Sequence, residues 1–282
     1  MKRVLTALVL IPSALVLVFL GPRWQWVFVL ASVLVSSLAA WEYLTFVRQA
    51  GSGSGAKPPR IPVLIAIAAL FAASFEWPDQ LDMTAVILCV GLLFWCTFTS
   101  PVARMIPDAA NAVFCLFYAG FTLVSLPMLR EQSNGPSLLV FLFCAVWAGD
   151  ITALYAGRLF GRHKLAPSIS PGKTWEGSIA SLLGSVAVVG GLLALADQLQ
   201  TRWNSVVLSY RDETWWYWLI LAALVNVAAQ AGDLAESALK RSAGVKDSGT
   251  LLPGHGGMLD RIDALLTAAP VLWYAQLIHQ RF

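Results

Sequence analysis

The chain has 282 residues, of which 58% are apolar and only 12% are charged, whereas a typical soluble domain is about 45–50% apolar and about 25% charged. This balance excludes a soluble globule, a disordered chain, a fibrous protein and a disulfide scaffold. The net charge of +3 is too small for a nucleic-acid-binding surface. Composition therefore predicts an all-α polytopic membrane protein with no soluble domain.

Apolar runs long enough to cross a bilayer, which takes about 20 residues, recur along the whole chain. The first begins after Lys2 and Arg3, and we interpret it as a retained span because no small-residue cleavage site follows it. We expect about nine transmembrane helices: 4–20, 24–47, 61–76, 83–100, 109–129, 136–157, 176–197, 214–233 and 264–280.

The distribution of basic residues indicates the orientation. Most of the nineteen Lys and Arg residues fall on one side if the N-terminus is cytoplasmic, as the positive-inside rule requires. We therefore expect the N-terminus inside and cytoplasmic loops at 158–175 and 234–263. A Gly-Ser-rich linker within 51–60 precedes the third span. The predicted domains are an N-terminal membrane bundle, 1–135, and a catalytic membrane bundle, 136–282.

Polar residues concentrate between Gly232 and Asp263. If the eighth span continues as a helix, one of its faces carries a carboxylate, a hydroxyl and two cations. A glycine-rich turn at 253–257 can bring backbone N–H groups close to an anion, and two carboxylates follow at the start of the last helix. Carboxylates beside cations are typical of a site for Mg²⁺ and phosphate; the alternative is a juxtamembrane loop with incidental ion pairs. The residues concerned are Asp233, Ser237, Lys240, Arg241, Asp260 and Asp263.

A second polar stretch surrounds the sixth and seventh spans. Asp150 lies inside an apolar run, where a carboxylate is either functional or a hydrogen-bonded structural group. Ser170, Lys173, Thr174 and Glu176 lie where the next helix begins. This segment resembles a helix N-terminus that can bind an anion, although Thr174 can equally serve only as an N-cap. Another acid, Glu42, lies within the second span, and the sequence supplies no account of it.

The C-terminal stretch resembles the signature of the phosphatidate cytidylyltransferase family. The resemblance rests on Ser237-Ala-Leu-Lys240-Arg241, Lys246-Asp247, Pro253-Gly-His255-Gly-Gly and Asp260-Arg261-Ile-Asp263, with support from Gly232-Asp233 and from Ser170-Pro171 to Gly177. Gly172 departs from the family, which usually has a second Lys there, and this shifts any phosphate contact to Lys173. Residues 1–135 match in hydropathy only.

The resemblance implies an integral membrane enzyme that condenses CTP with phosphatidic acid, giving CDP-diacylglycerol and pyrophosphate in phospholipid biosynthesis. It implies a requirement for Mg²⁺, with room for a second cation, a homodimer, and a site open to the cytoplasm of a bacterial inner membrane. By position, Asp233 and Asp260 correspond to the family's metal-binding carboxylates. A related polyprenol or archaeol-type lipid transferase and an anion transporter remain as alternatives.

Roles for the remaining residues follow from their chemistry together with this resemblance. Asp263 is expected to be a further metal ligand. Cations neutralise the triphosphate or the lipid phosphate: Lys240, Arg241, Lys246 and Arg261. The turn of His255, Gly256 and Gly257 is expected to cradle phosphate oxygens, and Ser237 to hydrogen-bond a phosphate or a metal-bound water. The wall of the site is completed by Asp150, Ser170, Lys173, Thr174 and Glu176.

Overall fold

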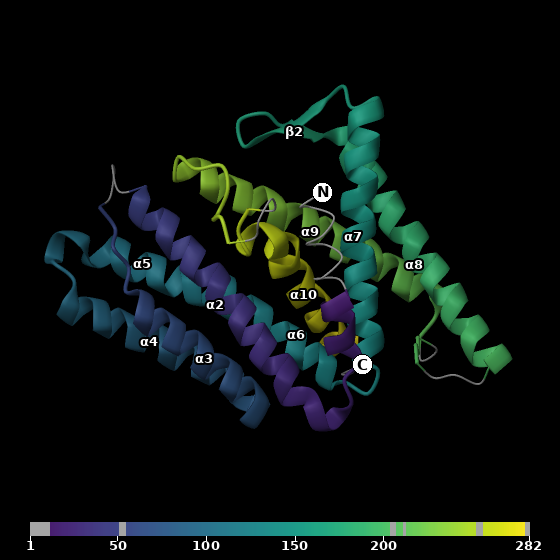
Figure 1. The fold of residues 1–282 in the computed structure, drawn as a ribbon, viewed down its shortest axis with the longest axis horizontal. Coiled ribbons are helices and arrows are strands. Elements are labelled where there is room, and N and C mark those ends of the chain that lie inside the picture. Colours follow the sequence, from purple (N-terminus) through teal and green to yellow (C-terminus); the bar gives the residue numbers. More distant parts are fainter. Residues whose placement is uncertain (1–11, 51–54, 204–206, 211–212, 252–255, 280–282) are drawn as a thin grey trace. The chain divides into compact units, whose positions relative to one another are not determined.

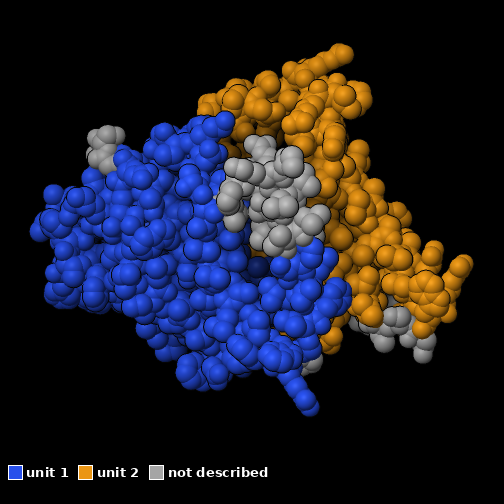
Figure 2. All heavy atoms as spheres, in the orientation of Figure 1, with its two compact units in different colours: residues 1–128, 239–262 blue, residues 129–238, 263–282 orange. Residues whose placement is uncertain are grey.

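The computed structural model describes residues 12–50, 55–203, 207–210, 213–251 and 256–279. It divides into two compact units, each built from two stretches of the chain (Figure 2). Unit 1 comprises residues 1–128 and 239–262, and unit 2 comprises residues 129–238 and 263–282. Residues 239–262 therefore group with the N-terminal half, whereas the domain division expected from the sequence placed them in the C-terminal half.

Unit 1 is built mainly from four helices that pack side by side (Figure 1). These are α2 (Gln25–Gln49), α3 (Arg60–Glu76), α4 (Leu81–Thr99) and α5 (Met105–Cys115), followed by a π-helical segment, η4 (Leu116–Phe121), and the start of α6 (Thr122–Glu131). The short 3₁₀ turns η1 (Pro22–Trp24), η2 (Pro78–Gln80) and η3 (Val102–Arg104) precede α2, α4 and α5.

The core of unit 1 satisfies its polar groups internally, as an apolar environment requires. The Ser36 hydroxyl on α2 donates to the carbonyl of Ala119 at 2.7 Å, within the π-helical segment, where the regular i−4 pattern is interrupted. The Tyr43 hydroxyl donates to Asn111 Oδ1 on α5 at 2.8 Å. These bonds attach α2 to the segment that runs from α5 into η4.

Unit 2 pairs two long antiparallel helices, α7 (Gly135–Phe160) and α8 (Trp175–Trp203), which a small hairpin connects (Figure 1). The hairpin strands are β1 (Lys164–Ala166) and β2 (Ser170–Thr174), antiparallel, with Lys164 opposite Thr174. The sequence prediction of an all-helical chain missed this hairpin. Strands of three and five residues are too short to show the alternating pattern by which a strand is recognised.

The remaining helices are α9 (Trp215–Ser242) and α10 (Leu259–His279), each of which begins in one unit and ends in the other. The eighth span does continue as a helix through Lys240 and Arg241, which was the condition for the shared face, because α9 ends at Ser242. Asp260 and Asp263 lie at the start of α10, as the sequence predicted.

A buried polar layer joins α8 to α9 in unit 2. Asn226 is 1% exposed, and its amide donates to the hydroxyls of Ser181 at 3.0 Å and Ser185 at 2.8 Å. Gln230 Nε2 donates to Asn226 Oδ1 at 2.7 Å. Gly149 on α7 lies against this layer, and a Cβ placed there would lie 2.2 Å from Asn226 Nδ2. Small residues and interhelical hydrogen bonds of this kind are typical of helix packing in membranes.

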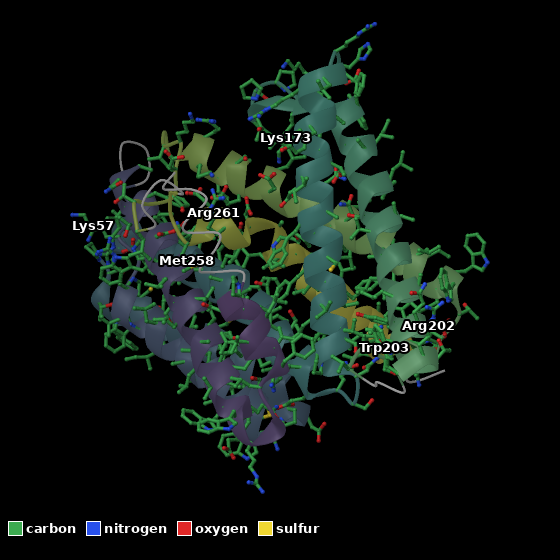
Figure 3. All side chains as sticks on the ribbon, turned by 45° about the vertical axis from the view of Figure 1, so that its right-hand side comes forward. Lys57, Lys173, Arg202, Trp203, Met258 and Arg261 are labelled. Carbon is green, nitrogen blue, oxygen red and sulfur yellow. The ribbon has the colours of Figure 1, made fainter. Side chains whose placement is uncertain are left out.

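Six helical segments of the described chain are long and apolar enough to cross a membrane: Gln25–Gln49, Pro78–Thr99, Val102–Glu131, Gly135–Phe160, Trp175–Trp203 and Trp215–Ser242. The protein is therefore an integral membrane protein, while the count of nine spans stays a prediction. At 29 residues, α8 is roughly 43 Å long, more than the roughly 30 Å of the hydrocarbon core. Figure 3 shows Lys173 near one end of α8 and Arg202 and Trp203 at the other.

Candidate active site

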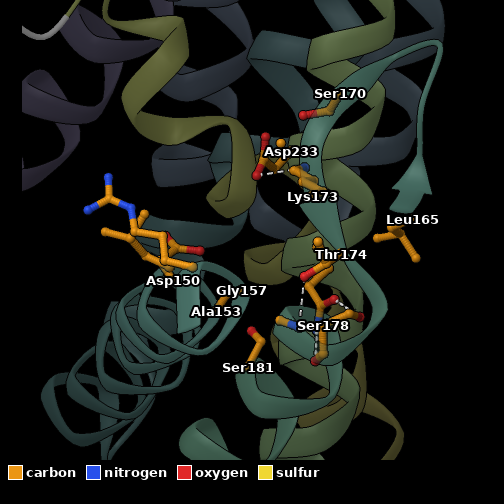
Figure 4. A pocket seen from close by; sticks show the side chains of 15 residues that line it. Asp150, Ala153, Gly157, Leu165, Ser170, Lys173, Thr174, Ser178, Ser181 and Asp233 are labelled. Carbon is orange, nitrogen blue, oxygen red and sulfur yellow. Dashed lines mark hydrogen bonds and ion pairs between the residues drawn. The ribbon is translucent and has the colours of Figure 1, made fainter. Parts of the chain in front are cut away.

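Unit 2 contains a cavity of about 620 Å³ that is lined by residues from α7, the hairpin, α8 and α9 (Figure 4). Its wall combines charged groups with small and apolar residues such as Ala153, Leu154 and Leu165. Several residues singled out from the sequence line it together: Asp150, Ser170, Lys173, Thr174 and Asp233. The structure thus gathers residues from three separate parts of the sequence around one space.

An ion pair joins the hairpin to α9 within this cavity. Lys173 Nζ on β2 lies 2.7 Å from Asp233 Oδ2 on α9, and Figure 4 draws the pair as a dashed line. The Lys173 side chain is 24% exposed, although its Nζ atom is buried, and that of Asp233 is 38% exposed, so a ligand can reach the carboxylate. An ammonium group can bind a phosphate and an accessible carboxylate can bind a cation.

Helix α7 contributes a stripe of residues to the same wall. Asp150, Leu154 and Arg158 follow one another at intervals of four and all line the cavity, because residues four apart share one face of a helix. Asp150 is exposed rather than enclosed in the helix bundle. One helix therefore contributes both an acidic and a basic residue to the wall of the cavity.

Thr174 and Glu176 both stabilise the junction between the hairpin and α8, but only Thr174 lines the cavity. The Thr174 side chain accepts a hydrogen bond from the Gly177 N–H at 3.2 Å, which is the N-cap arrangement, and Thr174 also lines the cavity. Glu176 does not line it. Its carboxylate lies 2.7 Å from His163 Nδ1 and accepts the His163 backbone N–H at 3.2 Å, which ties the start of the hairpin to α8.

Acidic groups gather near the start of the α10 segment that belongs to unit 2. Burial raises the pKa of Asp263, and so do the negative charges of Asp233, Glu236 and Asp150. A like charge nearby disfavours ionisation, so a cation among these groups would relieve their repulsion. Glu236 is fully buried and was assigned no role from the sequence; its position three residues after Asp233 on α9 was the available signal.

A second cluster lies in unit 1 and centres on Asp260. Its carboxylate lies 2.6 Å from Lys240 Nζ and accepts the backbone N–H groups of Ser248 at 3.0 Å and Gly257 at 2.9 Å. Burial alone would raise the pKa of Asp260, but the hydrogen bonds from Lys240, Gly257 and Ser248 outweigh it and lower that pKa. Asp260 is therefore held as a carboxylate by its neighbours.

Glu42 on α2 joins this second cluster. Its carboxylate accepts the Ser248 hydroxyl at 2.8 Å and the backbone N–H groups of Met258 and Leu259 at 2.9 Å each. Nothing in the local sequence connects Glu42 with Ser248, which lies 206 residues further along. A carboxylate inside an apolar span was the only signal available.

The other predicted site residues have less defined surroundings. Ser237 is half-buried on α9, whereas Arg241, Lys246 and Arg261 are exposed. Gly256 has a φ of +83°, and a Cβ there would lie 2.5 Å from Asp260 Oδ2, so glycine is required beside this carboxylate. His255 lies outside the described residues.

The predicted metal ligands can be tested for fit within each unit. Among the described residues, no group of three or more His, Cys, Asp or Glu side chains is placed to hold a metal ion. Mg²⁺, however, is usually bound through one or two carboxylates, with water and substrate phosphates as its other ligands. The accessible Asp233, with Asp263 near enough to interact electrostatically, fits that requirement. The oxygens of Asp260 already accept three protein donors.

Comparison with known proteins shows the family to which the chain belongs. Residues 1–279 match the model of the cytidylyltransferase family. A phosphatidate cytidylyltransferase of Brucella abortus biovar 1 is 48% identical over 159 residues, which are 56% of this chain and 54% of that protein. The chain thus spans about half the length of this relative.

Two other relatives align over nearly their whole length. Proteins named phosphatidate cytidylyltransferase from Haemophilus influenzae and Pseudomonas aeruginosa are 32% and 33% identical, and in both cases 97% of each chain is covered. The family match extends through both units, including the N-terminal half that resembled the family in hydropathy alone. The chain therefore belongs to the cytidylyltransferase family.

Proposed function

We propose that this protein transfers the cytidylyl group of CTP to phosphatidic acid and releases CDP-diacylglycerol and pyrophosphate. The observation that carries the proposal is the cavity of unit 2, in which Lys173, Arg158, Asp150 and Asp233 share one wall. Family membership and the names of the relatives support the same reaction. The reaction belongs to phospholipid biosynthesis.

The chemistry requires charge neutralisation more than a strong base. A phosphate oxygen of phosphatidic acid attacks the α-phosphorus of CTP, a new P–O bond forms, and the bond to the β-phosphate breaks as pyrophosphate leaves. Both reactants are anionic, so their approach is opposed by repulsion that fixed cations reduce. We assign this role to Lys173 and Arg158, which line the cavity, and positioning to the N-capped start of α8 at Thr174.

Mg²⁺ is the proposed cofactor, and Asp233 and Asp263 in unit 2 are the proposed ligands. We also propose Asp260 as a further ligand, on the basis of the sequence, because it lies at the start of α10 close to Asp263. When bound, the cation supplies charge to the triphosphate and orients it. With a cation bound, Asp233 would hold it in place of Lys173, and the Lys173 ammonium would then be available to a phosphate oxygen.

The wall of the cavity also suits a lipid substrate. Apolar residues on α7 and the hairpin, Ala153, Leu154 and Leu165, line the same cavity as the charged groups. We propose that the glycerol and the first part of the acyl chains of phosphatidic acid contact them, because these parts of the lipid are apolar. A lipid and a water-soluble nucleotide can then meet at one end of membrane helices.

The finer points of topology rest on the sequence. We propose nine spans with a cytoplasmic N-terminus, a site facing the cytoplasm and a location in a bacterial inner membrane, since Lys and Arg are biased toward the segments this assigns to the inside. A homodimer is proposed from the family resemblance.

The proposal is tested with purified protein in detergent–lipid micelles. CTP labelled in its cytidine and phosphatidic acid are supplied with and without Mg²⁺, and label in the lipid phase is counted. Label should enter the lipid phase only when phosphatidic acid and Mg²⁺ are both present. Label transferred instead to a polyprenyl or archaeol-type phosphate would favour the related lipid transferase, and anion flux without nucleotide in liposomes would favour a transporter.

A further inference from the structure

Glu42 is a buried acid that the proposed reaction leaves unused. It lies on α2, within one of the candidate membrane spans, and is 6% exposed. An ionisable side chain in such a position is costly unless suitable partners surround it, and it is a candidate for function. The role of Glu42 can therefore be inferred from its hydrogen-bond partners.

Three groups of the described chain contact the Glu42 carboxylate, and each is a hydrogen-bond donor. Met258 N–H donates to Oε1 at 2.9 Å, while Leu259 N–H, at 2.9 Å, and the Ser248 hydroxyl, at 2.8 Å, donate to Oε2. Accepting from every neighbour is what an ionised carboxylate does. The two backbone groups lie at the start of α10, where N–H groups have no partner within the helix and the helix dipole favours a negative charge.

The loop is shaped to admit this carboxylate. A Cβ at Gly257 would lie 2.2 Å from Glu42 Oε2, and one at Gly249 would lie 2.7 Å from Oε1. Any larger residue at either place would displace Glu42. Glycine at both positions allows the loop backbone to approach the carboxylate from two sides.

Ser248 carries the effect of Glu42 to Asp260. Its hydroxyl donates to Glu42, and its backbone N–H donates to Asp260 Oδ2 at 3.0 Å. Asp260 in turn lies 2.6 Å from Lys240 Nζ. A continuous series of hydrogen bonds therefore runs from α2 through Ser248 to two residues of the signature.

We propose that Glu42 is a positioning residue for the cytidylyl transfer: it holds the segments 248–251 and 256–259 so that Asp260 and Lys240 are correctly placed for substrate. This inference rests on the proposed function, which supplies the reaction that Asp260 and Lys240 serve. Glu42 itself does not touch the substrate. The N-terminal half of the chain, which carries none of the signature residues, thereby takes part in the reaction.

The first test is hydrogen exchange of the protein without substrates. The variant Glu42→Gln keeps the shape of the side chain but presents an NH₂ group to one of the N–H donors. We expect the amides of Met258 and Leu259 to exchange at least about tenfold faster, which corresponds to about 1.4 kcal/mol. Tyr43→Phe is the matched control, because it removes a hydrogen bond of the same helix to Asn111 and should leave these amides unchanged.

The second test is steady-state turnover of CTP and phosphatidic acid. Glu42→Gln should lower kcat by about 10–100-fold, the usual loss when a group that orients a functional carboxylate is removed. The KM for CTP should change less, because orientation affects the transition state more than binding. Ser248→Ala should cause a smaller loss in the same direction, since Glu42 keeps two of its donors. The double variant should lose less than the product of the two single losses.

The outcomes separate the inference from the function on which it rests. Faster exchange at Met258 and Leu259 with kcat within twofold of the parent protein would overturn the positioning role. Equal losses in Glu42→Gln and Tyr43→Phe would also overturn it, because both would then reflect general damage to α2. If Glu42→Gln fails to fold, Ser248→Ala decides by its kcat. A parent protein that forms no CDP-diacylglycerol would refute the proposed function, and the exchange test would still decide whether Glu42 orders the loop.

Discussion

Lys173 Nζ and Asp233 Oδ2 lie 2.7 Å apart in the cavity of unit 2, although the two residues come from a strand and a helix that are distant in sequence. The pair brings together one residue from each of the two polar stretches. Both side chains are partly exposed, so the pair adds little to stability, and the Asp233 carboxylate is accessible to a ligand.

The first prediction concerns the Lys173 ammonium. Lys173→Met should lower kcat by about 10²–10³-fold, the loss typical when one preorganised donor to a developing charge is removed, with little change in Tm. Lys164→Met is the matched control, since Lys164 lies on the partner strand β1, is exposed and does not line the cavity. Similar losses of kcat in the two variants would show that activity depends on the overall charge of the hairpin and not on the contact made by Lys173.

The second prediction concerns Mg²⁺. A chelator should abolish product formation, and added Mg²⁺ should restore it. Asp233→Asn should raise the Mg²⁺ concentration for half-maximal activity by about tenfold or more, because one anionic ligand is lost. Asp197→Asn, at an exposed position on α8, should leave that concentration unchanged. An unaltered Mg²⁺ requirement in Asp233→Asn would contradict the ligand assignment.

The third prediction concerns the stability of unit 1. Lys240→Met should destabilise the protein by about 3–5 kcal/mol, because it leaves the buried Asp260 carboxylate without its cation; the Asp260 side chain is only 6% exposed. Lys246→Met, at an exposed position, should change stability by less than about 0.5 kcal/mol. Unfolding in detergent, followed by heat or by denaturant, measures both. Equal stability of the two variants would show that the ion pair between Lys240 and Asp260 contributes nothing to the free energy of unfolding.

The fourth prediction concerns the close approach of α7 to the polar layer of unit 2. Gly149→Ala should destabilise by about 1–3 kcal/mol through overpacking, since the added Cβ would lie 2.2 Å from Asn226 Nδ2. Gly191→Ala on α8 meets no atom within 4 Å and should be neutral or stabilising by up to about 1 kcal/mol. Thermal unfolding measures both variants. A Tm for Gly149→Ala equal to or above that of Gly191→Ala would contradict the prediction.

Features that depend on neighbouring residues could be predicted from the sequence. Helical membrane spans, the continuation of α9 past Lys240 and the position of Asp260 at the start of α10 follow from local composition and helical periodicity. The N-cap at Thr174 also follows from local sequence, because the cap bonds to an amide only three residues away. The signature was recognisable for the same reason, since its residues lie close together along the chain.

Only the tertiary structure decided which distant groups meet. It paired Lys173 with Asp233, directed Glu176 to His163 rather than to the cavity, and brought Glu42 to Ser248 and the start of α10. Periodicity gives the face of a helix on which a residue lies but not the neighbour of that face, which depends on how the helices pack over long separations in the chain. Sequence therefore determined the class of protein and its reactive residue types, while packing determined the partners of Lys173, Glu176 and Glu42.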